Sequence, residues 1–194
     1  MKKIIVRIAT VFAVVSYLGR YQLANDSVRA AVSSSVVNKV ESIDNNQEQV
    51  YIPDDNLREA IKLYVDFNND NVITIEELSS LDSLYAEGVM SLQGLEHAEN
   101  LYSLQLNNSN LQTLNELKEL KNIYQLSIYD STIHDISALG DLEKISRLSL
   151  SKCNIKDIDV LGNLKNLYIL DLSENNISDI SSLTNLSSLE YLYL

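Results

Sequence analysis

The 194-residue chain contains no tryptophan, two phenylalanines and one proline, and tyrosine supplies the other 11 aromatic residues. Basic residues are also scarce, because 15 lysines and arginines stand against 27 aspartates and glutamates, for a formal net charge of −12. Such an acidic chain repels phosphate backbones, so we exclude nucleic acid as a partner. The single cysteine, Cys153, excludes an internal disulfide framework.

Residues suited to catalysis are few. The only two histidines, His97 and His134, have no nucleophile or metal-binding cluster beside them. The sequence also lacks a glycine-rich phosphate-binding loop. We therefore predict that the chain is not an enzyme.

The N-terminus carries a basic leader followed by an apolar run over residues 8–18. That run is too short for a bilayer-spanning helix, which needs about 20 residues, and it is typical of a secretory signal. Val28 and Ala30 predict a signal peptide over 1–30 with cleavage after Ala30, and no integral membrane span in the mature chain. Cleavage after Ala24 or an uncleaved anchor are the alternatives.

Residues 31–49 are rich in serine, asparagine and glutamine and lack an apolar period, which predicts a flexible spacer. Residues 50–81 are predicted to form a helical N-terminal cap, because Leu57, Ile61 and Val65 fall on one face of a helix.

A repeat with a period of 22 residues begins at Leu101. Positions 1, 4, 6, 11, 14, 17 and 20 carry leucine or isoleucine in all four complete blocks, which start at Leu101, Ile123, Ile145 and Leu167. Chance does not produce such agreement, so residues 82–194 are predicted to be structural repeats: one degenerate, four complete and one truncated. In the degenerate block, Leu84 and Val89 are assigned to positions 6 and 11.

The spacing within a block predicts its conformation. Positions 4 and 6 share one face of a short strand, and positions 11 to 20 return at three-residue intervals that suit a 3₁₀ turn. We therefore predict an α/β leucine-rich-repeat solenoid with parallel β-strands on its concave face and 3₁₀ or short helical turns on its convex side. A small α-helical, EF-hand-like cap is predicted at the N-terminal end of the solenoid.

Position 9 of each block is an inward-facing corner that suits small polar groups. Cys153 occupies this position, so it is predicted to be a structural residue.

Residues 66–77 fit the spacing of an EF-hand calcium loop. Its predicted ligands are Asp66, Asn68, Asp70, the Val72 carbonyl, Thr74 and Glu77. Asn71 stands where the loop usually has glycine, and asparagine tolerates the left-handed conformation better than most residues. The alternative needs no metal: Thr74 and Glu77 would form a capping box after a polar turn.

The second candidate site is the concave face, where tyrosine recurs at variable positions. Tyrosine offers a large contact area at low entropic cost, which favours protein binding, although it also suits exposed strand positions. The predicted partner-binding residues are Tyr102, Tyr124, Tyr129, Arg147, Tyr168, Asp171, Tyr191 and Tyr193.

The repeat over residues 176–186 (NISDISSLTNL) and the opening over 52–61 (IPDDNLREAI) resemble the internalin family of Gram-positive surface proteins. The resemblance covers about residues 51–194. It implies an exported protein, secreted or at the cell surface, that binds a protein partner through its concave face, often on host cells.

Two other functions remain open. The chain could be an intracellular regulator resembling the phosphatase-associated proteins with 22-residue repeats, or a targeting fragment of a larger secreted enzyme. Because residue 194 falls within the strand of the truncated repeat, before any cap, immunoglobulin-like domain or wall anchor, we expect a truncated reading frame.

Overall fold

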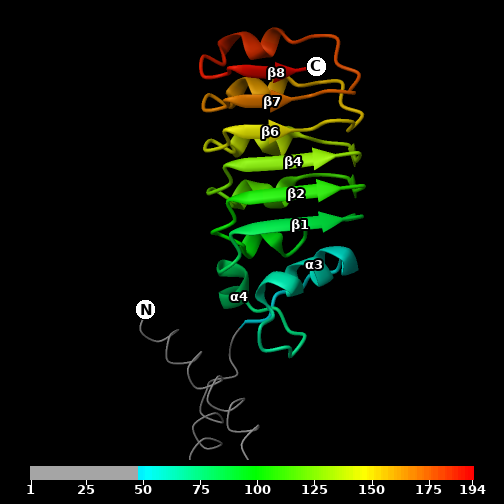
Figure 1. Cartoon of the computed structure of the whole chain (residues 1–194), viewed down its shortest axis with the longest axis vertical. Coiled ribbons are helices and arrows are strands. Elements are labelled where there is room, and N and C mark those ends of the chain that lie inside the picture. Colours follow the sequence, from blue (N-terminus) through cyan, green and yellow to red (C-terminus); the bar gives the residue numbers. More distant parts are fainter. Residues whose placement is uncertain (1–47) are drawn as a thin grey trace, which may run out of the picture. The chain divides into compact units, whose positions relative to one another are not determined.

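The computed structural model describes residues 48–194, so the predicted signal peptide and nearly all of the predicted spacer lie outside the described residues. Within 48–194, two short helices precede a stack of coils, each of which contributes one strand to a common sheet (Figure 1). None of the helices in this part of the chain has the length and apolar character needed to cross a bilayer.

The cap consists of helix α3 (Asp55–Val65) and helix α4 (Ile75–Ser79). The predicted helical face is confirmed, because Leu57, Ile61 and Val65 are all buried. Asp54 begins α3 by accepting a hydrogen bond from the Leu57 amide at 2.9 Å. Its other carboxylate oxygen accepts from the Met90 amide at 2.7 Å, which fixes the cap to the first coil.

The main sheet is parallel, with strand order β1-β2-β4-β6-β7-β8 (Figure 1). Its register aligns Leu84, Leu104, Leu126, Leu148, Leu170 and Leu192 in adjacent strands, as the repeat predicts. The strands are β1 (Ser83–Glu87), β2 (Ser103–Asn107), β4 (Gln125–Tyr129), β6 (Arg147–Ser149), β7 (Ile169–Asp171) and β8 (Tyr191–Tyr193).

Opposite the sheet, the coils of the first five strands each return through a short 3₁₀ helix, which confirms the predicted turns. These helices are η1 (Leu95–His97), η2 (Asn115–Glu119), η3 (Ser137–Asp141), η4 (Asp159–Asn163) and η5 (Ser181–Asn185). Each buries one leucine against the same core that the strand leucines fill. Strands β3 (Asn110–Leu111) and β5 (Thr132–Ile133) form a second, two-stranded sheet beside the main one.

The register of the degenerate block differs from the sequence prediction. Leu84 pairs with Leu104 and Ala86 with Leu106, so Leu84 occupies position 4, and its assignment to position 6 was wrong. The corner after β1 is two residues shorter than in the next coil, and Gly88 turns it with φ of +70°. Ala86 fills the buried position 6 of this block. The sequence pattern of large aliphatic residues therefore does not mark that position.

A ladder of polar contacts joins the corners of successive coils. The Ser109 hydroxyl accepts from the Val89 amide at 3.1 Å, and the Ser131 hydroxyl accepts from the Ser109 amide at 3.0 Å. At the next corner the Ser131 amide donates to the Lys152 carbonyl at 3.1 Å. A thiol is a weaker acceptor than a hydroxyl, so the side-chain contact between successive corners is weakest at Cys153.

The ladder continues at Asn175, whose amide oxygen accepts from the Cys153 and Ile155 amides at 3.0 Å each. Its amide nitrogen donates to the Leu150 carbonyl at 2.6 Å. The same nitrogen donates to the Leu172 carbonyl of its own coil at 2.8 Å, so one asparagine satisfies backbone groups of two coils, in agreement with the predicted role of position 9.

The C-terminal end of the stack is less covered than its middle. Leu192 in β8 is 39% exposed, whereas the equivalent Leu148 in β6 is 1% exposed. Ile180 is likewise 42% exposed against 1% for Ile158, 22 residues earlier. At these two positions the side chain is exposed where no further coil packs on it, so this part of the core is formed between neighbouring coils.

This difference gives a matched test of stability. We expect Leu148→Ala to lower the free energy of unfolding by about 2–5 kcal/mol, because it leaves a cavity between two coils. Leu192→Ala, on the open side of the stack, should cost less than about 1 kcal/mol. Urea denaturation followed by circular dichroism measures both. Equal losses would contradict the prediction and would show that β8 is covered in solution.

Candidate functional site

The tyrosines lie on one surface, which we call the strand face. It is formed by the outward side chains at the start of and along the six strands of the main sheet. Tyr102 and Tyr124, one coil apart, stack with ring centroids 5.1 Å apart and an interplanar angle of 7°. Tyr168 and Tyr191 form a second pair, edge to face, at 5.5 Å and 69°. The 22-residue period thus turns distant tyrosines into neighbours.

The six predicted tyrosines all lie outside the core, as predicted. Tyr102, Tyr191 and Tyr193 are 51%, 46% and 52% exposed, and the other three are half-buried. Tyr129, on β4, accepts a hydrogen bond from the Gln105 side-chain amide at 3.1 Å. The structure therefore gathers these residues on one surface, and their role in binding stays a prediction.

The strand face also includes Tyr85, which the sequence prediction missed. It lies on β1 and is 41% exposed. Tyr85 pairs with Gln105 and therefore occupies position 5, which lies outside the core in every block. The sequence prediction missed it because the degenerate block was assigned to the wrong register.

Hydrogen bonding holds Tyr168 in its neutral form. Its hydroxyl donates to a Glu190 carboxylate oxygen at 3.0 Å, and this bond, with a contribution from Tyr191, raises the pKa of Tyr168 to about 12. Tyr168 is therefore a positioned hydrogen-bonding group rather than a proton-transfer group at neutral pH.

The two cations of the strand face have different surroundings. The Lys152 ammonium lies 2.8 Å from an Asp130 carboxylate oxygen, and that hydrogen bond raises the pKa of Lys152. The exposed Arg147 side chain has no hydrogen bond or ion pair within residues 48–194. Asp171, also predicted to bind a partner, accepts from the Ser173 hydroxyl at 2.6 Å and from the Ser149 hydroxyl at 3.4 Å.

The predicted calcium loop connects α3 to α4. Asp66 accepts from the Asn71 amide with one carboxylate oxygen at 3.2 Å, and its other oxygen is buried without a hydrogen-bond partner. Asn69 and Asn71 adopt φ values of +57° and +64°. The left-handed conformation at Asn71 is the one that the loop requires at its sixth position.

The capping box of the alternative interpretation is also formed. One Glu77 carboxylate oxygen accepts from the Thr74 amide and hydroxyl at 3.0 Å each. The Asn68 amide nitrogen points toward Asp70, at 2.9 Å, and toward Glu77, at 3.5 Å. No three acidic, histidine or cysteine side chains form a metal-binding group in residues 48–194, so amide and backbone oxygens would have to complete any calcium site here.

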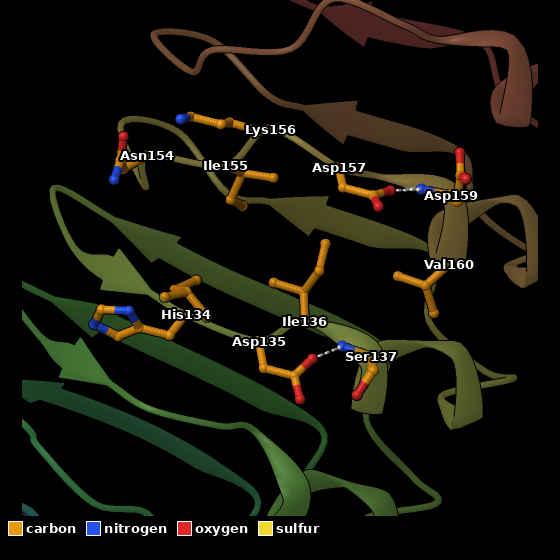
Figure 2. Close-up of a pocket in the computed structure, with 11 residues that line it drawn as sticks. His134, Asp135, Ile136, Ser137, Asn154, Ile155, Lys156, Asp157, Asp159 and Val160 are labelled. Carbon is orange, nitrogen blue, oxygen red and sulfur yellow. Dashed lines mark hydrogen bonds between the residues drawn. The ribbon is translucent and has the colours of Figure 1, made fainter.

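A groove of about 630 Å³ lies on the flank of the solenoid between the coils of β4 and β6 (Figure 2). The carboxylates at its edge cap 3₁₀ turns: Asp135 accepts from the Ser137 amide at 2.8 Å and Asp157 from the Asp159 amide at 2.9 Å. The hydrogen bond from Ser137 lowers the pKa of Asp135. These groups have a structural use already, and His134 lies exposed beside them.

Cys153 lies fully buried at the adjoining corner. Burial raises the pKa of its thiol to about 11, so the reactive thiolate is scarce at neutral pH. Its sulfur lies 3.2 Å from the Ile128 carbonyl oxygen. The cysteine is a core residue, as predicted from its position in the repeat.

Comparison with known proteins supports this architecture. A family model described as leucine-rich repeats in two copies matches residues 143–185. No curated protein matches the chain.

Two solved structures of internalins from Listeria monocytogenes 4b F2365 are similar to the chain. The first, InlF, is 35% identical with a TM-score of 0.70, and the match covers 78% of this chain and 46% of InlF. The second, InlC2, is 31% identical with a TM-score of 0.71, and the match covers 76% of this chain and 68% of InlC2. The chain thus spans less than half of InlF and about two thirds of InlC2. With the same stack of strands and 3₁₀ turns, and this identity over most of its length, the chain belongs to the internalin family of leucine-rich-repeat proteins.

Proposed function

We propose that the chain is an exported, non-catalytic recognition module that binds a protein outside the cell through its strand face. The observation that carries the proposal is the aromatic surface over neighbouring strands, with its two ring pairs. Stacked coils create an extended surface for macromolecules rather than an enclosed pocket for a small substrate.

The chemistry of this surface favours protein over other ligands. Tyrosine, tryptophan and arginine are enriched among the residues that dominate protein–protein binding energy, and the strand face supplies the first and the last of these. The two ring pairs hold four tyrosines in fixed positions, so binding of a partner costs little side-chain entropy of these tyrosines.

Replacement of one tyrosine from each pair tests the proposal. We expect Tyr124→Ala combined with Tyr168→Ala to weaken a captured protein partner by at least about 10-fold, since interface tyrosines often cost more than ~1.4 kcal/mol when truncated. Surface plasmon resonance against proteins captured from host-cell surfaces and bacterial envelopes would measure the change.

The matched control is Tyr51→Ala, which removes a tyrosine that is 72% exposed but lies outside the strands. Affinity and melting temperature should both stay near the wild-type values. If the double variant bound as well as the wild type, the binding site would lie elsewhere on the molecule.

Export is supported by the basic leader and short apolar run at the N-terminus and by the family to which the chain belongs. We expect the native protein to be recovered outside the cytosol and to begin at Ala31. N-terminal sequencing and cell fractionation measure this. An intact N-terminus in a cytosolic fraction would favour the intracellular regulator, and a catalytic domain encoded immediately downstream would favour a targeting fragment.

We further propose that the loop over residues 66–77 binds calcium. The supporting observation is the buried Asp66 carboxylate oxygen that has no hydrogen-bond partner, because an uncompensated buried acceptor costs free energy that a cation would recover. Asp66, Asn68, Asp70, Val72, Thr74 and Glu77 would hold the ion.

Calorimetry tests this site. We expect millimolar calcium to raise the melting temperature of the wild type, and Asp66→Ala to abolish the rise. Asp82→Ala, an exposed aspartate beyond α4, is the control that should keep it. An unchanged wild-type melting temperature with and without millimolar calcium would leave the loop as a capping box and polar turn only.

A further inference from the structure

The row of tyrosines on the strand face is interrupted in the β6 coil. The same position in four successive coils holds Tyr102, Tyr124, Ser146 and Tyr168. The Ser146 amide donates to the Tyr124 carbonyl at 2.9 Å, and the Tyr168 amide donates to the Ser146 carbonyl at 2.8 Å, so the serine lies one coil from each ring. Within residues 48–194 no ring pair joins Tyr124 to Tyr168. The aromatic surface therefore consists of two pairs with the β6 coil between them.

The residue after this serine is Arg147, the cation of the strand face that has no partner within the described chain. The register places it between Gln125 and Ile169. The nearest acid on the next strand, Asp171, is engaged by Ser173 and Ser149. Arg147 is thus available to an anion from outside, midway between the tyrosine pairs.

The spacing of these three features matches that of an extended peptide. The Tyr102–Tyr124 pair is centred between the β2 and β4 coils, and the Tyr168–Tyr191 pair between the β7 and β8 coils. Their centres are three strand steps apart, which is about 14 Å at ~4.8 Å a step. Four residues of an extended chain span about 13 Å, and residues i, i+2 and i+4 of such a chain point to the same side.

We infer that the strand face binds an extended protein segment with a single carboxylate on Arg147 and an apolar side chain two residues before and two residues after it, one on each tyrosine pair. This inference deepens the proposed function and rests on it. The segment crosses the strands along the axis of the stack.

The surrounding charge limits the segment to one acid. Six acidic residues also lie on or beside the strand face: Asp82, Glu87, Asp130, Asp171, Glu174 and Glu190. A run of acids would be repelled by them, whereas one carboxylate can form two parallel hydrogen bonds with the Arg147 guanidinium. Apolar neighbours on the tyrosines would exclude water from this ion pair and strengthen it.

The probe is a random 12-residue peptide library displayed on phage and selected on the full chain. We expect the enriched peptides to share an aspartate or glutamate with apolar or aromatic residues two positions to either side. A selected peptide is then synthesised with its acid and with the matching amide, and both are measured by fluorescence anisotropy against the wild type and Arg147→Gln.

The four affinities form a double-mutant cycle. Either single change should weaken binding at least 10-fold, and both together should weaken it no further than one alone. Lys165→Gln is the control, because Lys165 lies just beyond the 3₁₀ helix η4, on the side opposite the strands, and its ammonium bonds only the Gly162 carbonyl. It should leave all affinities unchanged.

Three results would overturn the inference. Peptides that need Tyr124 and Tyr168 but bind Arg147→Gln as well as the wild type would reject the carboxylate and leave the strand face as the binding site. Peptides insensitive to all three residues would reject the proposed function as well. Competition by inorganic phosphate as strong as that of the peptide itself would reduce Arg147 to a general anion site.

Discussion

The burial of aliphatic side chains between successive coils is the interaction on which the rest of this structure depends. Within one coil, the leucines at positions 4 and 6 and those of the 3₁₀ turn face a common interior, and the strand leucine at position 4 loses its cover where no further coil packs on it. The contrast between Leu148, 1% exposed, and Leu192, 39% exposed, shows this dependence within a single chain. Parallel strand pairing then fixes the distance and register between coils.

This stacking is also what creates a recognition surface. Residues 22 positions apart become lateral neighbours about 4.8 Å apart, so tyrosines at the same or adjacent positions of neighbouring coils form ring pairs, and a coil without tyrosine there separates the two pairs. The role of Ser146 and Arg147 depends on this stacking, because it places a small residue and an unpaired cation between two aromatic pairs. The fold supplies the spacing, and the variable positions supply the chemistry.

Local departures from the repeat have identifiable physical causes. The groove between the β4 and β6 coils adjoins the corner at Cys153, where a weakly accepting thiol replaces the serine hydroxyl of the preceding coils. The first coil is shortened at Gly88, where its carbonyl accepts a hydrogen bond from Asn56 of the cap. The cap is thus joined to the repeats by polar contacts from Asp54 and Asn56 as well as by its buried leucine and isoleucine.

The sequence by itself determined the solenoid, the alignment of Leu104 with its equivalents, the helical face of the cap and the outward position of the tyrosines, because each follows from a strict period and from the alternation of side chains along a strand. It could not give the register of the first coil, since an alanine at a buried position carries no aliphatic signal. Nor could it show that Tyr102 stacks on Tyr124, that Lys152 is paired while Arg147 is not, or that an Asp66 oxygen is buried without a partner. Those features depend on side-chain geometry between coils and around one turn, which only the tertiary structure decided.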